Sequence, residues 1–406
     1  MATHRIAVDP RDPDRDATAH ALYAAGPVAE VDVAGVRALA VTRHEELRSV
    51  VADRTGTFLR GGAQQNWRAL REGEVDPDSA LARLVGGSVG SLLTHNGAEH
   101  TRLRKPMQTR FTRRRVEALR PRVEELAEDL LADMDGAESV DVKDRFAWPL
   151  TVGVLVGLLG VDEEDAPVLG DIARRVFELT DPGVYADGQR FLRDLVAKRR
   201  ADPGDDLVSA LATAEEEERL TDDQLIANVF LLVIAGFETT MGTLANGVRA
   251  LLTHPGQLRR VTGGEVEWPT AVEEVLRRYT SVSLLPAVFA TRDTEVAGVP
   301  VPENEMVLLA YAAAALDPAA WESPDEFDVG RDSRGHLAFG HGPHLCLGAP
   351  LARLELNVAL PRLFHRFPDL ALDTAREADG SAAPVESWMM THPRQLWVHP
   401  HGTGAQ

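Results

Sequence analysis

A run of apolar residues between positions 225 and 237 constrains the fold of this chain more than any other feature. Its side chains are apolar on nearly every side of a helix, and such a helix has to be buried. Thr221 and Gln224 have the spacing of a capping box, which predicts that the helix begins just before the run. This run and the apolar stretch at 148–161 are both shorter than the roughly 20 residues that a membrane span needs. We therefore expect a central buried helix and no membrane segment.

The rest of the chain has the composition of a helix-rich globular protein. Its 406 residues are 44% hydrophobic and 26% charged, which is usual for soluble domains. Residues 117–134 carry apolar side chains at helical spacing, whereas 29–41 and 288–309 are rich in β-prone residues. We predict a mainly α fold with small β-sheets, in a single domain over residues 1–406. Its ends, residues 1–20 and 400–406, are predicted to be flexible.

The net charge and the first residues indicate which binding partners and which cellular location to expect. The formal net charge is -20 at pH 7, opposite to the basic surface that nucleic-acid binding requires, so we expect no nucleic-acid partner. Residues 1–13 are polar and contain proline, without the apolar core of a secretory signal. Together with the single cysteine of the chain, this pattern indicates a cytoplasmic protein.

That cysteine, Cys346, is the first candidate functional residue. A lone thiol cannot form an internal disulfide, complete a multi-cysteine zinc site or hold an iron–sulfur cluster by itself. It is therefore either a small buried side chain or a single soft ligand. Gly340, Gly342 and Gly348 surround it and allow the backbone to pass close to a ligand. The glycines favour the ligand interpretation.

Two polar motifs stand out on predicted helices. Glu238 and Thr239 follow Gly236 at the end of the apolar run, where a carboxylate without partners would be costly to bury. They form either a polar patch that reaches water or a groove beside a ligand, with Gly236 leaving space on one face. Further on, Glu274 and Arg277 lie three residues apart on one helical face, a spacing that alone is typical of surface ion pairs.

In chain order, these two motifs and the cysteine loop resemble the cytochrome P-450 superfamily of haem-thiolate monooxygenases, in particular its soluble bacterial members. The resemblance extends from residues 100–104 to residues 351–353 and is weakest before residue 90 and at 166–196. It implies the P-450 fold, in which a long central helix and the cysteine-ligand loop sandwich haem b.

The resemblance also implies roles for the motif residues. Cys346 is the implied iron ligand, because a thiolate is an electron-rich axial ligand that favours O–O cleavage. Thr239 and Glu238 are implied to manage oxygen and protons, and Glu274 and Arg277 to hold the cysteine loop and the segment before it.

Further residues are implied to contact the cofactor. Four of them match positions that bind the haem propionates, and Phe339 matches a residue that packs on the proximal face near the cysteine. The implied haem contacts are His100, Arg104, Ala235, Gly236, His336, Phe339, Gly340, His344, Cys346 and Gly348.

The chain departs from the family pattern at several positions. Where relatives usually carry a propionate-binding arginine, this chain has Val288, and either Arg292 or water has to compensate. Relatives commonly have Asn-Arg at the place of 315–316, which is Ala-Leu here. Some relatives have arginine where this chain has Glu326, which leaves the third partner of the Glu-x-x-Arg motif open.

Electrons are expected from outside, because the chain has no flavin or iron–sulfur module. The resemblance implies a ferredoxin and an NAD(P)H-driven ferredoxin reductase, acting on a protein that we expect to be monomeric. A basic run bordering the proximal haem face is predicted to dock the acidic ferredoxin. The alternative is a solvated helical face paired to acids such as Glu117 and Glu124. The run consists of Arg102, Arg104, Lys105, Arg110, Arg113, Arg114 and Arg115.

The segments that match the substrate pocket of the family are mostly apolar, which suits a mid-sized lipophilic molecule. A natural-product scaffold, a steroid or a fatty acid all agree with this composition. The candidate substrate contacts are Leu92, Leu93, Ile234, Ala235, Leu285, Ala287, Met389 and Met390.

The predicted activity is O₂-dependent oxidation of such a molecule, in the simplest case hydroxylation, as part of natural-product biosynthesis. Oxidative C–C or C–N coupling or ring closure on the same haem chemistry is the alternative. A non-catalytic haem-binding protein agrees less well with the paired Glu238 and Thr239, and a haem-free helical protein would use Cys346 only structurally.

Overall fold

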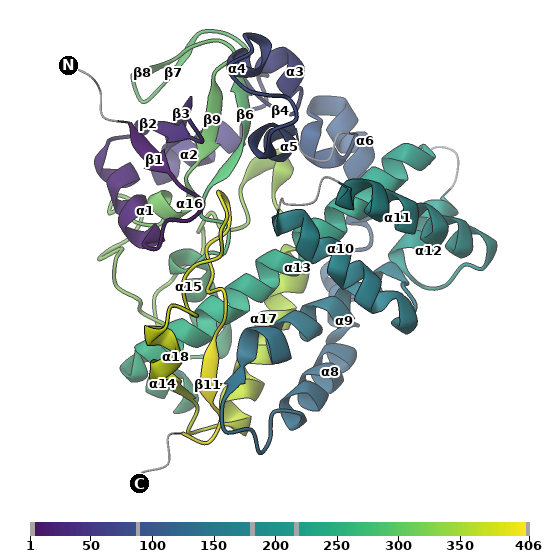
Figure 1. Ribbon diagram of the computed structural model, residues 1–406, viewed down its shortest axis with the longest axis vertical. Coiled ribbons are helices and arrows are strands. Elements are labelled where there is room, and N and C mark those ends of the chain that lie inside the picture. The colour runs from purple at the N-terminus through teal and green to yellow at the C-terminus, as the bar shows by residue number, and fades with distance from the viewer. Residues whose placement is uncertain (1–4, 87–89, 179–182, 215–218, 403–406) are drawn as a thin grey trace.

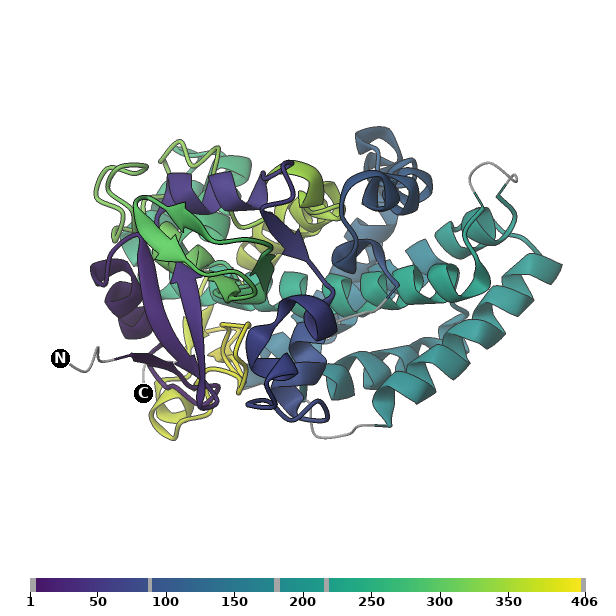
Figure 2. The ribbon, with the colours of Figure 1, turned by 90° about the horizontal axis from the view of Figure 1, so that it is seen from above.

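Helices make up most of the molecule, and a six-stranded sheet lies at the end that contains the N-terminus (Figure 1). The computed structural model describes residues 5–86, 90–178, 183–214 and 219–402. Seen from above, the strands gather on the left and the teal helices around residues 185–230 extend to the right (Figure 2). The mainly α fold with small sheets that the sequence predicts is confirmed.

The helices follow one another along the whole chain. In the N-terminal half they are α1 (Arg15–Ala24), α2 (His44–Val51), α3 (Ala63–Asn66), α4 (Arg68–Arg71), α5 (Ala80–Gly86), α6 (Gly97–Gln108), α7 (Arg113–Glu117), α8 (Arg120–Ala132), α9 (Trp148–Leu159), α10 (Ala166–Glu178) and α11 (Val184–Ala201). They continue with α12 (Leu207–Ala212), α13 (Asp222–Thr253), α14 (Pro255–Thr262), α15 (Trp268–Arg278), α16 (Tyr311–Ala314), α17 (Ala349–Arg366) and α18 (Thr374–Ala378). Single turns lie at η1 (Leu92–Thr94), η2 (Lys143–Ala147), η3 (Glu163–Asp165) and η5 (Gly342–His344).

The strands form three sheets within the described residues. The largest has the order β1-β2-β3-β9-β6-β4, and the smaller ones are β10-β11-β5 and β7-β8. Both β-prone segments of the sequence contribute strands, as predicted. The strands are β1 (Ile6–Val8), β2 (Val28–Val33), β3 (Val36–Val41), β4 (Phe58–Arg60), β5 (Val140–Asp141), β6 (Leu285–Ala290), β7 (Thr294–Val296), β8 (Val299–Val301), β9 (Met306–Leu309), β10 (Ala371–Leu372) and β11 (Trp397–His399).

The predicted helix at 117–134 is divided in the structure. α7 ends at Glu117, and α8 begins at Arg120 with Pro121 in its first turn. Proline has no N–H to donate and is accommodated best in the first turn of a helix, so α8 begins just before Pro121.

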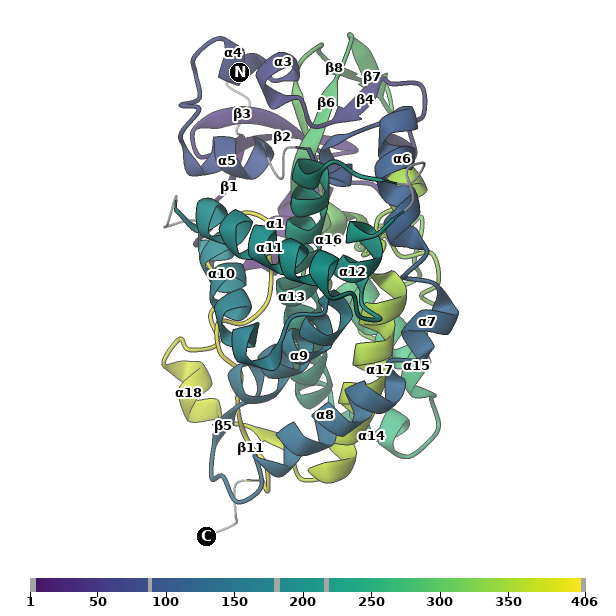
Figure 3. The ribbon, with the colours of Figure 1, turned by 90° about the vertical axis from the view of Figure 1, so that its right-hand side faces the viewer.

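The apolar run lies in α13, which crosses the middle of the molecule (Figures 1 and 3). The capping box is confirmed: the Thr221 hydroxyl accepts from the Gln224 N–H and the Gln224 side chain accepts from the Thr221 N–H, both at 3.2 Å. The helix is longer than the run and reaches Thr253, so by length and composition it could cross a membrane. However, it packs against α9, α10, α11, α15 and α17, which identifies it as the core helix of the fold.

Position 236 corrects one expectation about α13. A Cβ atom at Gly236 would lie 2.5 Å from the Leu155 Cδ1 atom of α9. The glycine therefore lets α9 and α13 approach closely, and Leu155 fills the space that the sequence assigned to a groove or a cofactor.

The Glu-x-x-Arg motif of α15 is a buried ion pair. The Arg277 Nε and Nη2 atoms each donate to the Glu274 carboxylate at 2.8 Å, and both side chains are inaccessible to solvent. Arg277 also donates to the carbonyls of Ala315 and Pro324, at 2.9 and 3.0 Å. The pair thus ties the segment that leads to the cysteine loop onto α15.

The third partner of this pair is Arg331, whose Nε atom donates to Glu274 at 3.3 Å. The Ser333 hydroxyl donates to the same carboxylate at 2.5 Å. Glu326 contributes only its backbone carbonyl, which accepts from Arg277 at 3.1 Å. The family position that this chain lacks is therefore replaced by an arginine five residues further on.

Replacing Arg277 with methionine should destabilise the protein, because Glu274 then loses its main partner while remaining buried. Breaking a buried ion pair costs about 3–5 kcal/mol. Arg334→Met is the control, since Arg334 and Asp332 form an exposed pair whose loss is expected to leave the midpoint nearly unchanged. Urea-unfolding midpoints of the two variants and the wild type measure the difference. Equal midpoints for Arg277→Met and the wild type would contradict the role of the pair.

Candidate functional site

The loop that carries Cys346 turns sharply before α17. The Cys346 N–H donates to the Phe339 carbonyl at 2.8 Å, which closes the loop. Gly340 and Gly342 have φ angles of 69° and 71°, in the left-handed region that favours glycine. A Cβ atom at Gly342 would lie 2.7 Å from the Ala52 Cα atom, so the loop passes directly against the end of α2. These glycines allow the tight path that brings the sulfur to the start of α17.

The Cys346 sulfur lies among hydrogen-bond donors. The backbone N–H groups of Gly348 and Ala349 donate to it, and the charges of Arg104 and Arg353 act on it. Burial raises the pKa of the Cys346 thiol, and these donors and charges oppose that rise. Protein atoms pack closely around the sulfur, although the residue as a whole is exposed. The hydrogen-bond donors and positive charges suit a thiolate that binds a ligand.

Phe339 packs inside the same loop. The Arg353 guanidinium lies 4.5 Å from the centre of the Phe339 ring, and the ring is half-buried. This contact joins the loop to the first turns of α17.

α6 and the cysteine loop meet through three predicted residues. The Arg104 Nη2 atom donates to the Leu345 carbonyl at 2.7 Å. The rings of His100 and His344 lie with their centres 4.1 Å apart and their planes tilted by 41°. Burial and then the Arg104 charge lower the pKa of His100 to about 4, and burial and then the Arg60 charge lower that of His344 to about 2. Both rings are therefore neutral near pH 7.

Neutral imidazole has one donor and one acceptor nitrogen, and a buried ring nitrogen normally has a partner. The His100 Nε2 and His344 Nδ1 atoms are buried and have none among the described residues. Two adjacent rings with such nitrogens, next to Arg104, match the oxygen-rich edge of a carboxylate-bearing ligand.

His336 does not join this group. Its Nε2 atom lies 3.2 Å from a Glu273 carboxylate oxygen, and its Nδ1 atom accepts from the Ala338 N–H at 3.1 Å. Arg353 pairs with the same Glu273 at 2.6 Å. Because both ring nitrogens are engaged, His336 helps to hold the cysteine loop, and its contact with a propionate stays a prediction.

α13 presents one accessible patch in its middle. Ala235 is exposed although Val233 and Phe237 beside it are fully buried. One turn later, the Thr239 hydroxyl donates to the Ala235 carbonyl at 2.6 Å. The Thr239 carbonyl in turn accepts from the Ser281 hydroxyl at 2.7 Å. An exposed alanine inside a core helix fits the flat apolar face of a macrocycle.

Glu238 has a partner that the sequence did not reveal. Its Oε1 atom lies 2.7 Å from the His392 Nε2 atom, and both side chains are buried. Burial acts to raise the pKa of Glu238, but the His392 hydrogen bond, supported by the charges of Lys143 and Arg174, holds it below its usual value. The carboxylate is therefore ionised at neutral pH.

A cavity of about 1060 Å³ lies beside Glu238. Glu238 and Met241 of α13 form part of its wall, and none of its lining residues belongs to the cysteine loop. Most of the remaining wall is charged or polar, including Lys143, Asp144, Arg145, Arg174, Glu386 and Arg394. Glu238 thus lines a cavity whose wall carries several charged side chains.

The candidate substrate contacts are distributed over several elements. Leu92 is 7% exposed, and its N–H donates to the Asn228 side chain of α13 at 2.8 Å. Met390 is 1% exposed and lines the same cavity as Glu238. The side chain of Ala287 lies outside the described residues. Leu93, Ile234, Leu285 and Met389 are half-buried.

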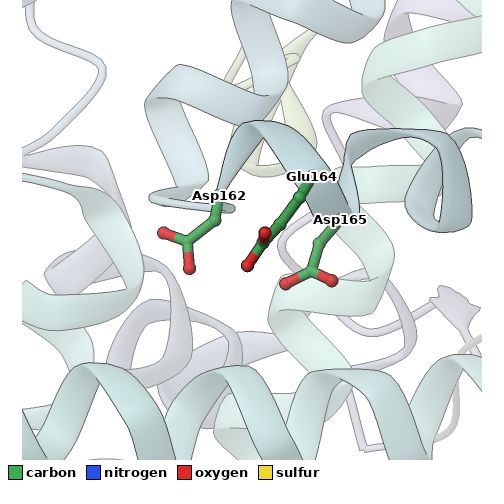
Figure 4. A group of neighbouring side chains, drawn as sticks. All are labelled: Asp162, Glu164 and Asp165. Atoms are coloured by element: carbon green, nitrogen blue, oxygen red, sulfur yellow. The ribbon is translucent and has the colours of Figure 1, made fainter.

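A separate acidic group lies at the end of α9. Figure 4 shows the Glu164 carboxylate between those of Asp162 and Asp165, and ligand atoms of the three residues lie within 4.8 Å of one another. Asp162 pairs with Lys198 and, at 2.6 Å, with Arg199. These ion pairs account for the arrangement, and we assign no metal to it.

Comparison with known proteins identifies the family. A family model described as cytochrome P450 matches residues 174–263 and 269–379. The 6-deoxyerythronolide B hydroxylase of Saccharopolyspora erythraea is 43% identical over 287 residues, which cover 69% of this chain and 71% of that protein. The 2-hydroxy-5-methyl-1-naphthoate 7-hydroxylase of Streptomyces carzinostaticus is 36% identical over 417 residues, covering 100% and 99%.

Solved structures agree over the full length. CYP154C4 from Streptomyces sp. W2061 has a TM-score of 0.91 and 37% identity, covering 100% of both chains. The cytochrome P450 enzyme CxnD, described as forming a C–S bond in chuangxinmycin biosynthesis, has a TM-score of 0.87 and 28% identity, covering 99% of this chain and 98% of that chain.

Members of this family carry haem and require O₂, a small-molecule substrate and a redox partner. The exposed Cys346, the exposed Ala235 and the unpartnered histidine nitrogens fit such a cofactor. Sequence identity over the whole chain and the shared fold lead to the same conclusion: this chain belongs to the cytochrome P450 family and is a haem-dependent monooxygenase.

Proposed function

We propose that Cys346 ligates the iron of haem b and that the protein hydroxylates a mid-sized lipophilic intermediate of natural-product biosynthesis. The observation that carries this proposal is the Cys346 sulfur, which accepts two backbone N–H groups at the start of α17 and belongs to an exposed residue. When bound, haem with a thiolate ligand supplies O₂ activation. The balanced reaction consumes R–H, O₂, two electrons and two protons, and yields R–OH and water.

Glu238 and Thr239 are the residues that we assign to proton delivery. Glu238 borders the polar cavity, and Thr239 lies one residue on, a turn after the exposed Ala235. An ionised carboxylate can take a proton from water in the cavity and pass it to a water held by the Thr239 hydroxyl. His392 keeps Glu238 in the ionised form that accepts the proton.

The substrate class rests on the apolar side chains around Ala235 and on the relatives. Two relatives are named for hydroxylating 6-deoxyerythronolide B and 2-hydroxy-5-methyl-1-naphthoate. We infer a substrate of similar size and apolar character for this chain. We place it against the predicted contacts Leu92, Leu93, Ile234, Ala235, Leu285, Ala287, Met389 and Met390.

Oxidative coupling is the second candidate reaction, because CxnD shares the fold and is described as forming a C–S bond. The same residues would serve either outcome, since coupling differs only in how the substrate radical is consumed. Product analysis with O₂ labelled by ¹⁸O separates the two: a hydroxylated product carries the label, whereas a ring-closed product lacks it.

The redox partner that we propose is an acidic ferredoxin, reduced by its NAD(P)H-dependent reductase. α7 packs against α17, so its surface borders the element that starts at the cysteine loop. The arginines at 113–115 are exposed, and no carboxylate of the described residues lies within ion-pair distance of them. Glu117 and Glu124 pair with Arg120 instead, at 2.9 and 3.8 Å. The positive surface is thus available for a partner.

The proposed setting is the cytoplasm, with the chain acting as a monomeric single domain. Ferredoxin, its reductase and NAD(P)H are all soluble and would reach the protein there. The buried place of α13 supports a soluble protein.

Cys346→Ala should abolish the thiolate-type Soret band in the reduced-CO difference spectrum, because the only thiol of the chain is then lost. Leu345→Ala is the control, since this exposed neighbour contributes no side-chain ligand and should leave the band in place. A thiolate-type band that survives in Cys346→Ala would contradict the assignment.

Glu238→Gln should reduce coupled turnover by about 100-fold, the lower range for loss of a positioned general acid–base. The dissociation constant of the substrate, read from its spin-state shift, should stay unchanged. His392→Phe should move the acidic limb of the pH–rate profile to higher pH. Burial then raises the pKa of Glu238 without the opposing hydrogen bond, so the ionised form is lost at a higher pH.

The matched control for both variants is Glu386→Gln, because Glu386 lines the same cavity but is exposed. It should leave the turnover and the pH profile unaltered. A His392→Phe profile that overlays the wild type, or equal losses in Glu238→Gln and Glu386→Gln, would argue against proton delivery through Glu238.

Reversing two charges by Arg113→Glu with Arg114→Glu should lower ferredoxin-supported turnover by about tenfold at low salt. The difference should shrink as salt screens the interaction. The control is Arg190→Glu with Arg193→Glu on α11, which makes the same change in net charge on another exposed helix. If turnover and its salt dependence matched the wild type, docking at α7 would be wrong.

A further inference from the structure

Arg60 is a buried cation that no acid of the described residues neutralises. It is 7% exposed, and no carboxylate in the described part of the chain lies within ion-pair distance of it. Its side chain hydrogen-bonds to the hydroxyl of Tyr311, itself a neutral group. Burying a cation without an anion is costly, so a residue in this position indicates a bound anion.

The backbone of Arg60 is fixed to the start of α6. The Asn96 side chain accepts from the Arg60 N–H at 3.1 Å and donates to the Arg60 carbonyl at 2.7 Å. Asn96 is the residue before α6, the helix that carries His100 and Arg104. Figure 3 shows β4 and β6 close to α6 at the same end of the molecule. The clamp therefore holds Arg60 beside the helix that meets the cysteine loop.

The register of the sheet places Arg60 directly opposite Val288. β4 and β6 are antiparallel, with Arg60 paired to Val288. Residues directly opposite each other in such a pair point to the same face of the sheet, with Cβ atoms about 4.5–5.5 Å apart. A cation at position 60 thus reaches the region that a long side chain at position 288 would reach.

Two buried nitrogens without partners lie within reach of the Arg60 charge. The charge of Arg60 acts on His100, His344 and Tyr311, which shows that the guanidinium lies close to all three. The His100 Nε2 and His344 Nδ1 atoms are the buried nitrogens without partners among the described residues. A guanidinium and two imidazoles converging without a counter-charge form a carboxylate site, because charged hydrogen bonds to carboxylates are strong and directional.

We propose that Arg60 binds a propionate of haem and takes over, from the neighbouring strand, the contact that an arginine at position 288 would make. The inference rests on the proposed haem site and adds a cofactor-binding residue to it. Arg292 does not fill this role, because it is exposed on the turn after β6 and donates to the hydroxyl of Thr57, the residue before β4. Arg60 on β4 therefore supplies the cation that β6 lacks at Val288.

The test compares haem release from three holoproteins to apomyoglobin. Arg60→Gln should release haem about tenfold faster than the wild type, as expected for losing one charged hydrogen bond. Arg292→Gln is the matched control and should stay within about twofold of the wild type, because an exposed hydrogen bond contributes little. The double variant Arg60→Gln with Val288→Arg should recover most of the slow release, since the cation is returned to the same region.

A second readout addresses the carboxylate itself. Wild-type apoprotein should bind haem more tightly than haem dimethyl ester, and Arg60→Gln should narrow this difference. Unchanged release by Arg60→Gln, or an equal loss of affinity for haem and its ester, would overturn the proposal. If Arg60→Gln does not fold, the double variant decides: slow release supports the proposal, and release tenfold faster than the wild type contradicts it.

The outcome is distinct from that of the proposed function. Haem release reports on the propionate contact, whereas the reduced-CO spectrum reports on the Cys346 ligand. A wild type without a thiolate-type band would sink the Cys346 assignment and leave the release comparison intact. A wild type with that band and an Arg60→Gln variant with unchanged release would sink only the Arg60 contact.

Discussion

The buried pair of Glu274 and Arg277 is the interaction on which the site depends. Two charges without solvent access are stable only when their hydrogen bonds are satisfied, and here Arg331, Ser333 and several backbone carbonyls satisfy them. Those partners all lie in the segment that runs into the cysteine loop. The buried pair on α15 thus holds a long irregular segment in place, and this segment leads to Cys346 just before α17.

α13 supplies the second constraint, because its sides meet different environments. Gly236 packs closely against Leu155, Ala235 lies on an exposed patch, and Glu238 borders the polar cavity. A single helical turn can present these environments because successive residues point in directions about 100° apart. The proposed route for protons runs from this cavity through Glu238 to a water held by the Thr239 hydroxyl.

The proposed cofactor pocket combines residues that are distant in the chain. Arg60 comes from a strand, His100 and Arg104 from α6, and His344 from the cysteine loop. The sequence indicated the last three through family motifs, since each lies in a recognisable segment. Arg60 has no such signal: a lone arginine near a predicted strand is usually a surface residue. Only the register of β4 against β6 and the Asn96 clamp show that it belongs to this region.

The sequence by itself determined the central buried helix, its capping box, the β-prone segments and the single thiol. These features depend on local periodicity and on residue chemistry, which neighbouring positions specify. The tertiary structure alone decided that His392 partners Glu238, that Arg331 completes the buried pair and that His336 serves the loop. Each of these contacts depends on which distant side chain packs next to a buried polar atom. That choice is made by packing, because a buried group needs a partner but its own sequence does not say where the partner lies.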